Sequence, residues 1–380
     1  MSLTKIIATI GPASEKLETI CSLIKAGVDV FRLNLKHNSL NWHQEKIKKI
    51  KKATKILNRP VGILLDFPDL DLKKTLKRFS LALKEEVDFI AMSLINKKED
   101  IETLKKWAKK IYFSPTILAK IETKKALKNL DSIIDSAAGI MVARGDLGKA
   151  VPIEEVPYYQ KIIIQKCIQK GKPVVTATQM LASMVANPIP TRAEVSDVAN
   201  AILDYTDAVM LSEETAIGKY PLQAVKTMKK VCEFWEKKRN PVPELNFEFP
   251  NSTSALCYSA YQMSKSPICQ KENIEAFIVL TKGGTSAQMI SRFRPNIPIF
   301  ALTFDKKLRD RLCLVYGVKP IYLKEKKDIY SKKGPKDIEN ILRIAKENGK
   351  IKKGKKVIFL YAENWKKLGR ANILRIQKIP

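Results

Sequence analysis

Short β-branched segments alternate with amphipathic segments over the first 240 residues, and this alternation constrains the fold most. Eight segments have the length and composition of buried strands, at residues 5–10, 28–33, 61–66, 88–93, 116–121, 139–143, 173–178 and 207–211. Each is followed by a helical pattern, the last at about residues 221–237. Strands that alternate with helices form parallel βαβ units. Eight such units predict an α/β chain with a (β/α)8 TIM barrel at residues 1–240.

The pattern breaks at residues 237–250, where a charged segment with two prolines (KKRNPVPE) predicts a linker. Strand patterns return at residues 276–281, 299–303, 319–323 and 356–361, separated by helical stretches. We therefore expect a smaller open α/β domain at residues 250–380.

The composition is strongly basic, with 69 Lys+Arg against 39 Asp+Glu and a formal net charge of +30. The lysines are spread along the whole chain, which favours a biased surface composition over a nucleic-acid site, although such a field also attracts small anionic substrates. A nucleic-acid-associated role stays open as a minor alternative. No apolar run reaches the length of a membrane span, the first residues do not resemble a signal peptide, and the six cysteines are scattered. We expect a soluble cytoplasmic protein.

Charged and polar residues follow six of the expected strands. In a barrel, reacting groups gather at the carboxyl ends of the strands. Glu122 and Asp146 end adjacent strands and offer the hard oxygen ligands that Mg²⁺ prefers. Lys120 and Arg32 could neutralise a phosphoryl group during transfer. The other strand-end residues are Asp66, Arg144, Gly145, Thr178 and the segment 212–215. An ordinary surface ion pair explains one such residue, but six polar strand ends favour a site.

Several long motifs resemble those of pyruvate kinase, and together they cover nearly the whole chain. They are TKIIATIGPAS at 4–14, ILAKIE at 117–122, GIMVARGDLG at 139–148, KPVVTATQML at 172–181, PTRAEVSDVAN at 190–200, DAVMLS at 207–212 and ETAIGKYP at 214–221. The resemblance implies transfer of a phosphoryl group from phosphoenolpyruvate to ADP, giving pyruvate and ATP in glycolysis, with Mg²⁺ or Mn²⁺. It also implies a homotetramer.

The resemblance implies a role for each strand-end residue. Glu122 and Asp146 would hold the divalent metal, while Lys120, assisted by Arg32, would stabilise the phosphoryl group. Gly145 and Thr178 would seat the substrate carboxylate, and Thr178 would join a proton relay to the enolate carbon. The remaining pocket positions are Asn34 and His37 on the nucleotide side, and Ser93.

The chain departs from the family pattern after the third strand. Family members usually insert a lid domain there, with a KGPEIR segment, whereas here Asp66 is followed by FPDLD and the next helical stretch. Lids of this kind exclude water and complete a catalytic site. The alternative to an active kinase is therefore an impaired relative that binds phosphoenolpyruvate or pyruvate as a sensor or scaffold.

The region that binds a monovalent cation in the family is also altered, at Asn34, Lys36, Asp66 and Phe67. Lys36 replaces a serine and Phe67 replaces a threonine, so two oxygen donors are lost. Either the site has drifted, or the Lys36 ammonium takes the place of K⁺ and pairs with Asp66; both interpretations stay open. On either interpretation we expect no requirement for K⁺.

A glycine-rich turn in the second domain is similar to the family's effector loop. It comprises Thr281, Lys282, Gly283, Gly284, Thr285 and Ser286. Consecutive backbone N–H groups and hydroxyls before a helix can form an anion nest. A sugar-phosphate effector is the expected ligand, although such turns are common.

Overall fold

The computed structural model describes residues 2–380 except 244, 246, 273, 325–329, 332–333, 336–337, 350 and 364–369. The chain divides into two compact units, Met1–Asn240 and Pro241–Pro380. Within the described residues, no helix is long and apolar enough to cross a membrane.

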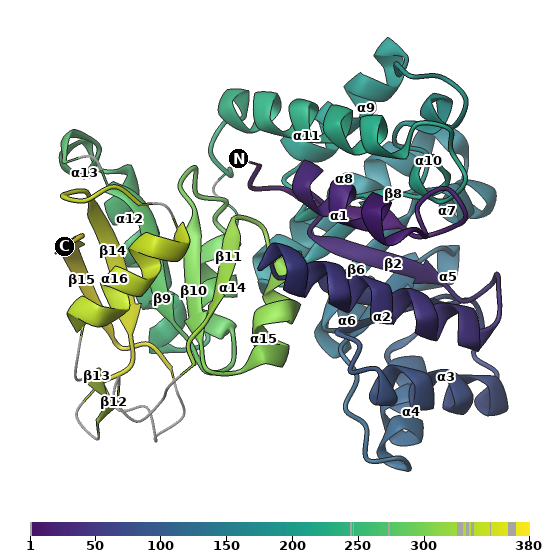
Figure 1. Cartoon of the computed structure of the whole chain (residues 1–380), viewed down its shortest axis with the longest axis horizontal. Coiled ribbons are helices and arrows are strands. Elements are labelled where there is room, and N and C mark those ends of the chain that lie inside the picture. Colours follow the sequence, from purple (N-terminus) through teal and green to yellow (C-terminus); the bar gives the residue numbers. More distant parts are fainter. Residues whose placement is uncertain are drawn as a thin grey trace. The chain divides into compact units, whose positions relative to one another are not determined.

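The first unit is a closed barrel of eight parallel strands, β1 to β8 in sequence order (Figure 1). The strands are β1 (Lys5–Thr9), β2 (Val30–Asn34), β3 (Gly62–Phe67), β4 (Phe89–Met92), β5 (Ile117–Ile121), β6 (Gly139–Ala143), β7 (Val174–Ala177) and β8 (Ala208–Leu211). The barrel closes by pairing of β1 with β8. The expected fold is thus confirmed. Nearly every strand residue is buried, because the barrel interior and the surrounding helices cover both faces.

Helices cover the outside of the barrel and connect its strands. They are α1 (Leu17–Ala26), α2 (Leu40–Leu57), α3 (Leu72–Lys84), α4 (Lys98–Lys109), α5 (Lys124–Lys128), α6 (Leu130–Ser136), α7 (Arg144–Ala150), α8 (Val156–Lys170), α9 (Arg192–Leu203), α10 (Glu213–Ala216) and α11 (Pro221–Lys238), with short 3-10 turns at Ile153–Glu155 and Ala182–Val185. Local signals start several of them. Ser39 caps α2 by accepting from the Trp42 N–H, and Thr191 and Glu194 form a capping box on α9.

The connection between β3 and α3 is short. Four residues, Pro68 to Asp71, separate the two elements. Arg78 on α3 donates to both carboxylate oxygens of Asp69, at 3.0 and 3.1 Å, and the Phe67 ring packs against Phe79. These contacts tie the strand directly to its helix at the point where a lid would be inserted.

The second unit is a five-stranded sheet in the order β11-β10-β9-β14-β15. Its strands are β9 (Ile274–Leu280), β10 (Ile299–Thr303), β11 (Val318–Tyr322), β14 (Lys356–Tyr361) and β15 (Ile373–Lys378). Two further strands, β12 (Tyr330–Ser331) and β13 (Gly334–Pro335), form a separate two-stranded antiparallel sheet. The helices are α12 (Ser252–Lys265), α13 (Pro267–Lys271), α14 (Thr285–Ser291), α15 (Lys306–Arg311) and α16 (Ile338–Gly349), with a 3-10 turn at Leu312–Leu314.

Alternate strand residues of the second unit build two cores, one on each face of the sheet. Phe277 and Ile358 belong to the core that includes residues of α12 and α14, whereas Ile278 and Phe359 belong to the core that includes residues of α16. The four parallel strands match the expected open α/β domain. The antiparallel edge strand β15 was not expected.

Candidate functional site

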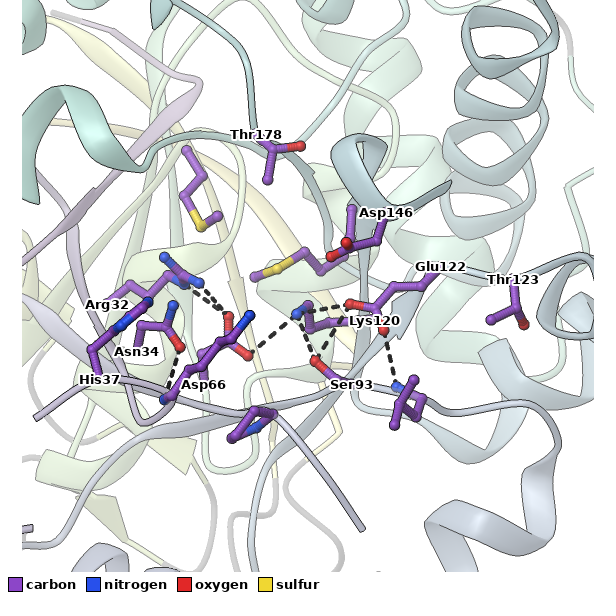
Figure 2. Close-up of a pocket in the computed structure, with 16 residues that line it drawn as sticks. Arg32, Asn34, His37, Asp66, Ser93, Lys120, Glu122, Thr123, Asp146 and Thr178 are labelled. Carbon is purple, nitrogen blue, oxygen red and sulfur yellow. Dashed lines mark hydrogen bonds and ion pairs between the residues drawn. The ribbon is translucent and has the colours of Figure 1, made fainter. Parts of the chain in front are cut away.

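A pocket of about 420 Å³ opens at the carboxyl ends of the barrel strands. Figure 2 shows its charged residues converging from several strands. The lining residues are Arg32, Asn34, Lys36, His37, Asp66, Pro68, Ser93, Leu94, Lys120, Glu122, Thr123, Met141, Ala143, Asp146, Thr178 and Met210. Most of the sequence-predicted barrel site therefore lies in one cavity, including Ser93; Gly145 lies directly beside Thr178.

Asp66 lies between two cationic side chains. Its Oδ2 accepts from Arg32 Nε at 2.8 Å and lies 2.7 Å from Arg32 Nη2, while its Oδ1 is 3.5 Å from Lys120 Nζ. Arg32 also donates to the Thr9 hydroxyl at 3.0 Å. All three charged side chains are buried, so their interactions are weakly screened by solvent. Figure 2 shows Arg32 and Lys120 on either side of Asp66, which holds both cations in the pocket.

Lys120 is further held by Glu122 and Ser93. Its Nζ lies 2.8 Å from Glu122 Oε1 and donates to Ser93 Oγ at 2.7 Å. Burial by itself lowers the pKa of Lys120, but the Asp66 and Glu122 carboxylates outweigh burial and raise this pKa above its ordinary value. Lys120 is therefore a permanent cation at neutral pH.

The turn after β4 orients Glu122. Glu122 Oε2 accepts from the Leu94 N–H at 3.0 Å, and Leu94 adopts a positive φ of 62°. This conformation is uncommon for a residue with a large side chain, and it aims the N–H at the carboxylate.

Gly145, Asp146 and Thr178 form the other side of the pocket. The Thr178 hydroxyl accepts from the Gly145 N–H at 2.8 Å. A Cβ at position 145 would lie 3.4 Å from that hydroxyl, so glycine keeps this approach open. Asp146 lies in the first turn of α7, and its side chain is 53% exposed beside Lys149.

Arg144 holds the turn that carries Thr178. Thr178 and Gln179 have positive φ values of 70° and 54°. The buried Arg144 guanidinium donates to the carbonyls of Thr178 at 2.6 Å and Gln179 at 3.2 Å, and to Asp197 Oδ1 at 2.6 Å. Sequence reasoning noted Arg144 only as a strand-end residue, because its contacts join segments far apart in the chain.

The last residue of β2, Asn34, and the turn after it, with Lys36 and His37, form part of the pocket wall. Asn34 Oδ1 accepts from the Lys36 N–H at 3.1 Å. The Lys36–Asp66 pair, which one of the two open interpretations required, is not formed among the described residues, because Arg32 and Lys120 already occupy the Asp66 carboxylate.

Phe67 does not line the pocket. Successive strand residues point to opposite sides of β3, so Asp66 faces the pocket while Phe67 is fully buried against Phe79. Of the four residues predicted for the monovalent-cation region, Asn34, Lys36 and Asp66 therefore share the pocket and Phe67 is outside it.

The pocket suits a hard divalent cation that takes few protein ligands. The described residues contain no group of three or more His, Cys, Asp or Glu side chains able to hold a metal. Glu122 and Asp146 nevertheless both line the pocket, and Mg²⁺ commonly takes one or two carboxylates together with water and substrate oxygens. The donor set thus fits Mg²⁺ or Mn²⁺.

The predicted effector loop lies in the second unit, between β9 and α14. The buried Thr281 hydroxyl accepts from the Gly284 N–H at 2.9 Å, and Gly284 has a positive φ of 84°. A Cβ at position 284 would lie 3.0 Å from Leu308, so only glycine fits this turn easily. The phosphate-binding role of residues 281–286 stays a prediction.

Sequence reasoning missed the pocket residues Pro68, Leu94, Thr123, Met141, Ala143 and Met210. Thr123 follows Glu122 directly, so its strand-end position was a usable signal. Met141 and Met210 lie within apolar strands, and nothing in their local sequence distinguishes a residue that lines the pocket from one that packs in the barrel core.

The closed parallel barrel and its charged pocket define a (β/α)8-barrel protein with clustered cations and carboxylates at the carboxyl ends of its strands. Two family models match it: "Pyruvate kinase, barrel domain" at residues 1–77 and 68–225, and "Pyruvate kinase, alpha/beta domain" at residues 255–377. The chain belongs to the pyruvate kinase family.

Proteins named pyruvate kinase are similar to this chain over most of their length. The protein from Thermotoga maritima is 32% identical over 476 aligned positions, covering 100% of both chains. The protein from Lactobacillus delbrueckii is 30% identical, covering 100% of this chain and 81% of its own, and pyruvate kinase 2 of Synechocystis is 33% identical, covering 84% and 70%. An alignment of 476 positions exceeds the 380 residues of this chain, so the Thermotoga protein has segments that this chain lacks.

Proposed function

We propose that this chain catalyses the pyruvate kinase reaction. The bond between phosphorus and the enol oxygen of phosphoenolpyruvate breaks, an oxygen of the ADP β-phosphate bonds to that phosphorus, and the enolate carbon gains a proton. The observation that carries the proposal is the convergence of Arg32, Lys120, Glu122, Asp146 and Thr178 on one pocket.

Arg32 and Lys120 would stabilise the phosphoryl group during transfer. Both cations are buried and held by Asp66 before any substrate arrives, so little reorganisation is needed when charge develops. Charge stabilisation and positioning are the main contributions a protein makes to phosphoryl transfer.

Glu122 and Asp146 would hold the divalent cation. When bound, this cation neutralises charge on the substrate oxygens that it contacts. The protein's own contribution is to orient Glu122, through the Leu94 N–H and Lys120, and to leave Asp146 half-exposed at the pocket edge.

Thr178 and Gly145 would serve the other end of the substrate. The Gly145 N–H donates to the Thr178 hydroxyl, and that hydroxyl donates to the Ala177 carbonyl at 2.5 Å, so a substrate carboxylate would take over both donors from these partners. The same hydroxyl is suited to pass a proton to the enolate carbon, because it lies in the pocket wall and can both donate and accept. Asn34 and His37 would face the nucleotide.

One observation favours the sensor or scaffold alternative. Only four residues link β3 to α3, so the described barrel has no inserted domain there to cover the pocket. Without such a cover, water can reach the phosphoryl group and transfer to ADP becomes less efficient.

A coupled assay that follows pyruvate formation from phosphoenolpyruvate, ADP and Mg²⁺ tests the proposal. Glu122→Gln and Asp146→Asn should each lower turnover by roughly a hundredfold or more and abolish Mg²⁺-dependent binding of phosphoenolpyruvate. Asp131→Asn is the control, since Asp131 is an exposed aspartate paired with a lysine outside the pocket. Turnover of the unaltered chain at background, with retained phosphoenolpyruvate binding, would favour the sensor.

We further propose that turnover needs no K⁺. Arg32 and Lys120 already neutralise Asp66, and the Phe67 ring faces away from the pocket. Replacing K⁺ by tetramethylammonium at equal ionic strength should leave turnover unchanged within about twofold, because screening is then matched. A severalfold stimulation specific to K⁺ would refute this part.

Other expectations of the family stay predictions for this chain: a homotetramer, a sugar-phosphate effector and a cytoplasmic location. The net charge of +30 gives no reason to add a nucleic-acid role.

A further inference from the structure

Lys36 differs from the other Lys and Arg side chains that line the pocket. Arg32 and Lys120 each pair with a buried carboxylate. Among the described residues, no carboxylate lies within ion-pair distance of Lys36, although Lys36 lines the same pocket. The positive charge of Lys36 is therefore not used by the fold.

The backbone under Lys36 is fixed. The Leu35 N–H donates to the Asp66 carbonyl at 2.9 Å, and the His37 N–H donates to the Asn34 carbonyl at 3.2 Å. The Asn34 side chain accepts from the Lys36 N–H, as described above. The turn is thus anchored to β3, and only the exposed side chain of Lys36 is free to reach a ligand.

The strand order gives Lys36 a definite position in the pocket. The Lys36 turn follows β2, whereas Asp146 follows β6, and these strands are on opposite sides of an eight-stranded ring. In Figure 2, Lys120 lies between the Asn34–His37 side and the Asp146 side, and Arg32 lies on the Asn34–His37 side. Phosphoryl transfer requires the attacking and leaving oxygens roughly in line, on opposite sides of the phosphorus. If Glu122, Asp146, Gly145 and Thr178 hold the donor, the acceptor enters from the β2 side.

We infer that Lys36 binds a phosphate of the acceptor nucleoside diphosphate. This inference rests on the proposed function and assigns the acceptor side of the same pocket. The Lys36 ammonium has no carboxylate partner among the described residues, is attached to an anchored backbone, and offers three donors to phosphate oxygens. It also supplies the acceptor side with a further cation beside Asn34 and His37.

The test measures ADP affinity by calorimetry and KM by the coupled assay, both with Mg²⁺. Lys36→Ala should raise Kd and KM for ADP by roughly tenfold to a hundredfold, the range of a charge-assisted hydrogen bond, while KM for phosphoenolpyruvate changes by less than about threefold. Lys36→Arg keeps the charge and should recover most of the affinity. Lys48→Ala is the matched control, since Lys48 is also exposed but lies on α2 outside the pocket.

The readouts separate the inference from the proposed function. Turnover in the unaltered chain, with ADP affinity unchanged in Lys36→Ala, overturns the inference alone. An equal loss in Lys48→Ala, or a loss confined to phosphoenolpyruvate, also overturns it. Lys36-dependent ADP binding without turnover supports the inference and counts against the kinase.

Discussion

Asp66 is a buried carboxylate with two cations, and this makes the pocket sensitive to single changes. Removing Arg32 or Lys120 leaves a buried charge with fewer partners, which destabilises a protein more than the pair itself stabilises it. Changes at these two positions will therefore lower both activity and stability. Activity is better probed at Asp146 and Lys36, because their side chains are exposed. Glu122→Gln is also a suitable change, because glutamine has nearly the same shape as glutamate.

His43 adds a pH dependence at the residue scale. Its ring is buried, and its Nε2–H donates to the His37 carbonyl at 2.8 Å, while Nδ1 is buried with no hydrogen-bond partner. Burial lowers the pKa of His43, and the bond to the His37 carbonyl opposes this only in part. The folded state therefore binds its proton at lower pH than the unfolded state does.

The sign of the effect follows from linkage. A lowered folded pKa contributes stability that is present above about pH 6.5 and is lost as pH falls through the folded pKa. Between about pH 7.5 and 5, the free energy of unfolding should fall more steeply in the unaltered chain than in His43→Gln, whose amide can still donate to the His37 carbonyl. Urea denaturation of both proteins at several pH values in this range measures the two free energies of unfolding and tests this difference. Parallel profiles for the two proteins would mean that His43 does not titrate with unfolding.

The gathering of the candidate residues in one pocket was readable from the sequence, but their pairing was not. Glu122, Lys120 and Asp146 follow strand patterns, so their gathering in one place could be predicted. Two features were not predictable: Ser93 bridges Lys120 and Glu122, and Lys36 does not pair with Asp66. Both depend on how side chains from separate strands pack together. One sequence does not determine such packing.

At the scale of elements, the turn after β7 depends on Arg144. A β-branched residue with φ near 70° is strained by about 1–3 kcal/mol, and the carbonyls of this turn would otherwise lack donors. Arg144 satisfies the carbonyls of Thr178 and Gln179 with one guanidinium group, and Asp197 holds that group in place. Arg144 thus acts as a positioning residue for Thr178.

Arg144→Lys keeps the charge but loses the forked donor geometry. We expect kcat to fall by roughly tenfold or more through misplacement of Thr178, with a smaller change in Mg²⁺ affinity, because the Arg144 guanidinium binds the Thr178 turn and Asp197 and neither Glu122 nor Asp146. Exchange of the pyruvate methyl protons, measured by NMR in D₂O, should fall in parallel with kcat. Arg59→Lys serves as the control, since Arg59 pairs with Asp29 away from the pocket. A normal exchange rate in Arg144→Lys would contradict the positioning role.

The elements themselves were largely predictable. The bounds of all eight barrel strands were predicted to within a few residues. Short apolar segments that alternate with helical segments form parallel βαβ units, so both the strands and their parallel order could be predicted. The edge strand β15 was missed, since its sequence ILRIQK mixes apolar and charged residues along a half-exposed edge. Its pairing with β14 is antiparallel, which the βαβ pattern does not predict.

At the scale of the whole molecule, the surface charge and the missing lid act on the same pocket. A net charge of +30 would raise the local concentration of the proposed anionic substrates and speed their arrival, more so at low salt. It does not replace a cover, because attraction does not exclude water. The structural finding that bears on rate is the four-residue link between β3 and α3.

The two half-reactions depend on a cover to different degrees. On the proposed function, exchange of the pyruvate methyl protons needs Thr178 and a divalent cation held by Glu122 and Asp146, and these three residues all line the barrel pocket. Phosphoryl transfer also needs the nucleotide to be clamped and water to be kept from the phosphorus. We therefore expect transfer to be impaired far more than exchange.

The comparison uses the Thermotoga maritima pyruvate kinase, measured in the same buffers, as the reference protein. The rate of methyl-proton exchange should agree with that of the reference within about tenfold. The value of kcat/KM for ADP should be lower by roughly a hundredfold or more, because a lid that would contact the nucleotide and close over the transition state is absent from the described barrel. Pyruvate release from phosphoenolpyruvate without ADP should be measurable, since water can attack in place of ADP. Equal ratios for exchange and transfer, with no hydrolysis, would require that another part of the molecule covers the pocket.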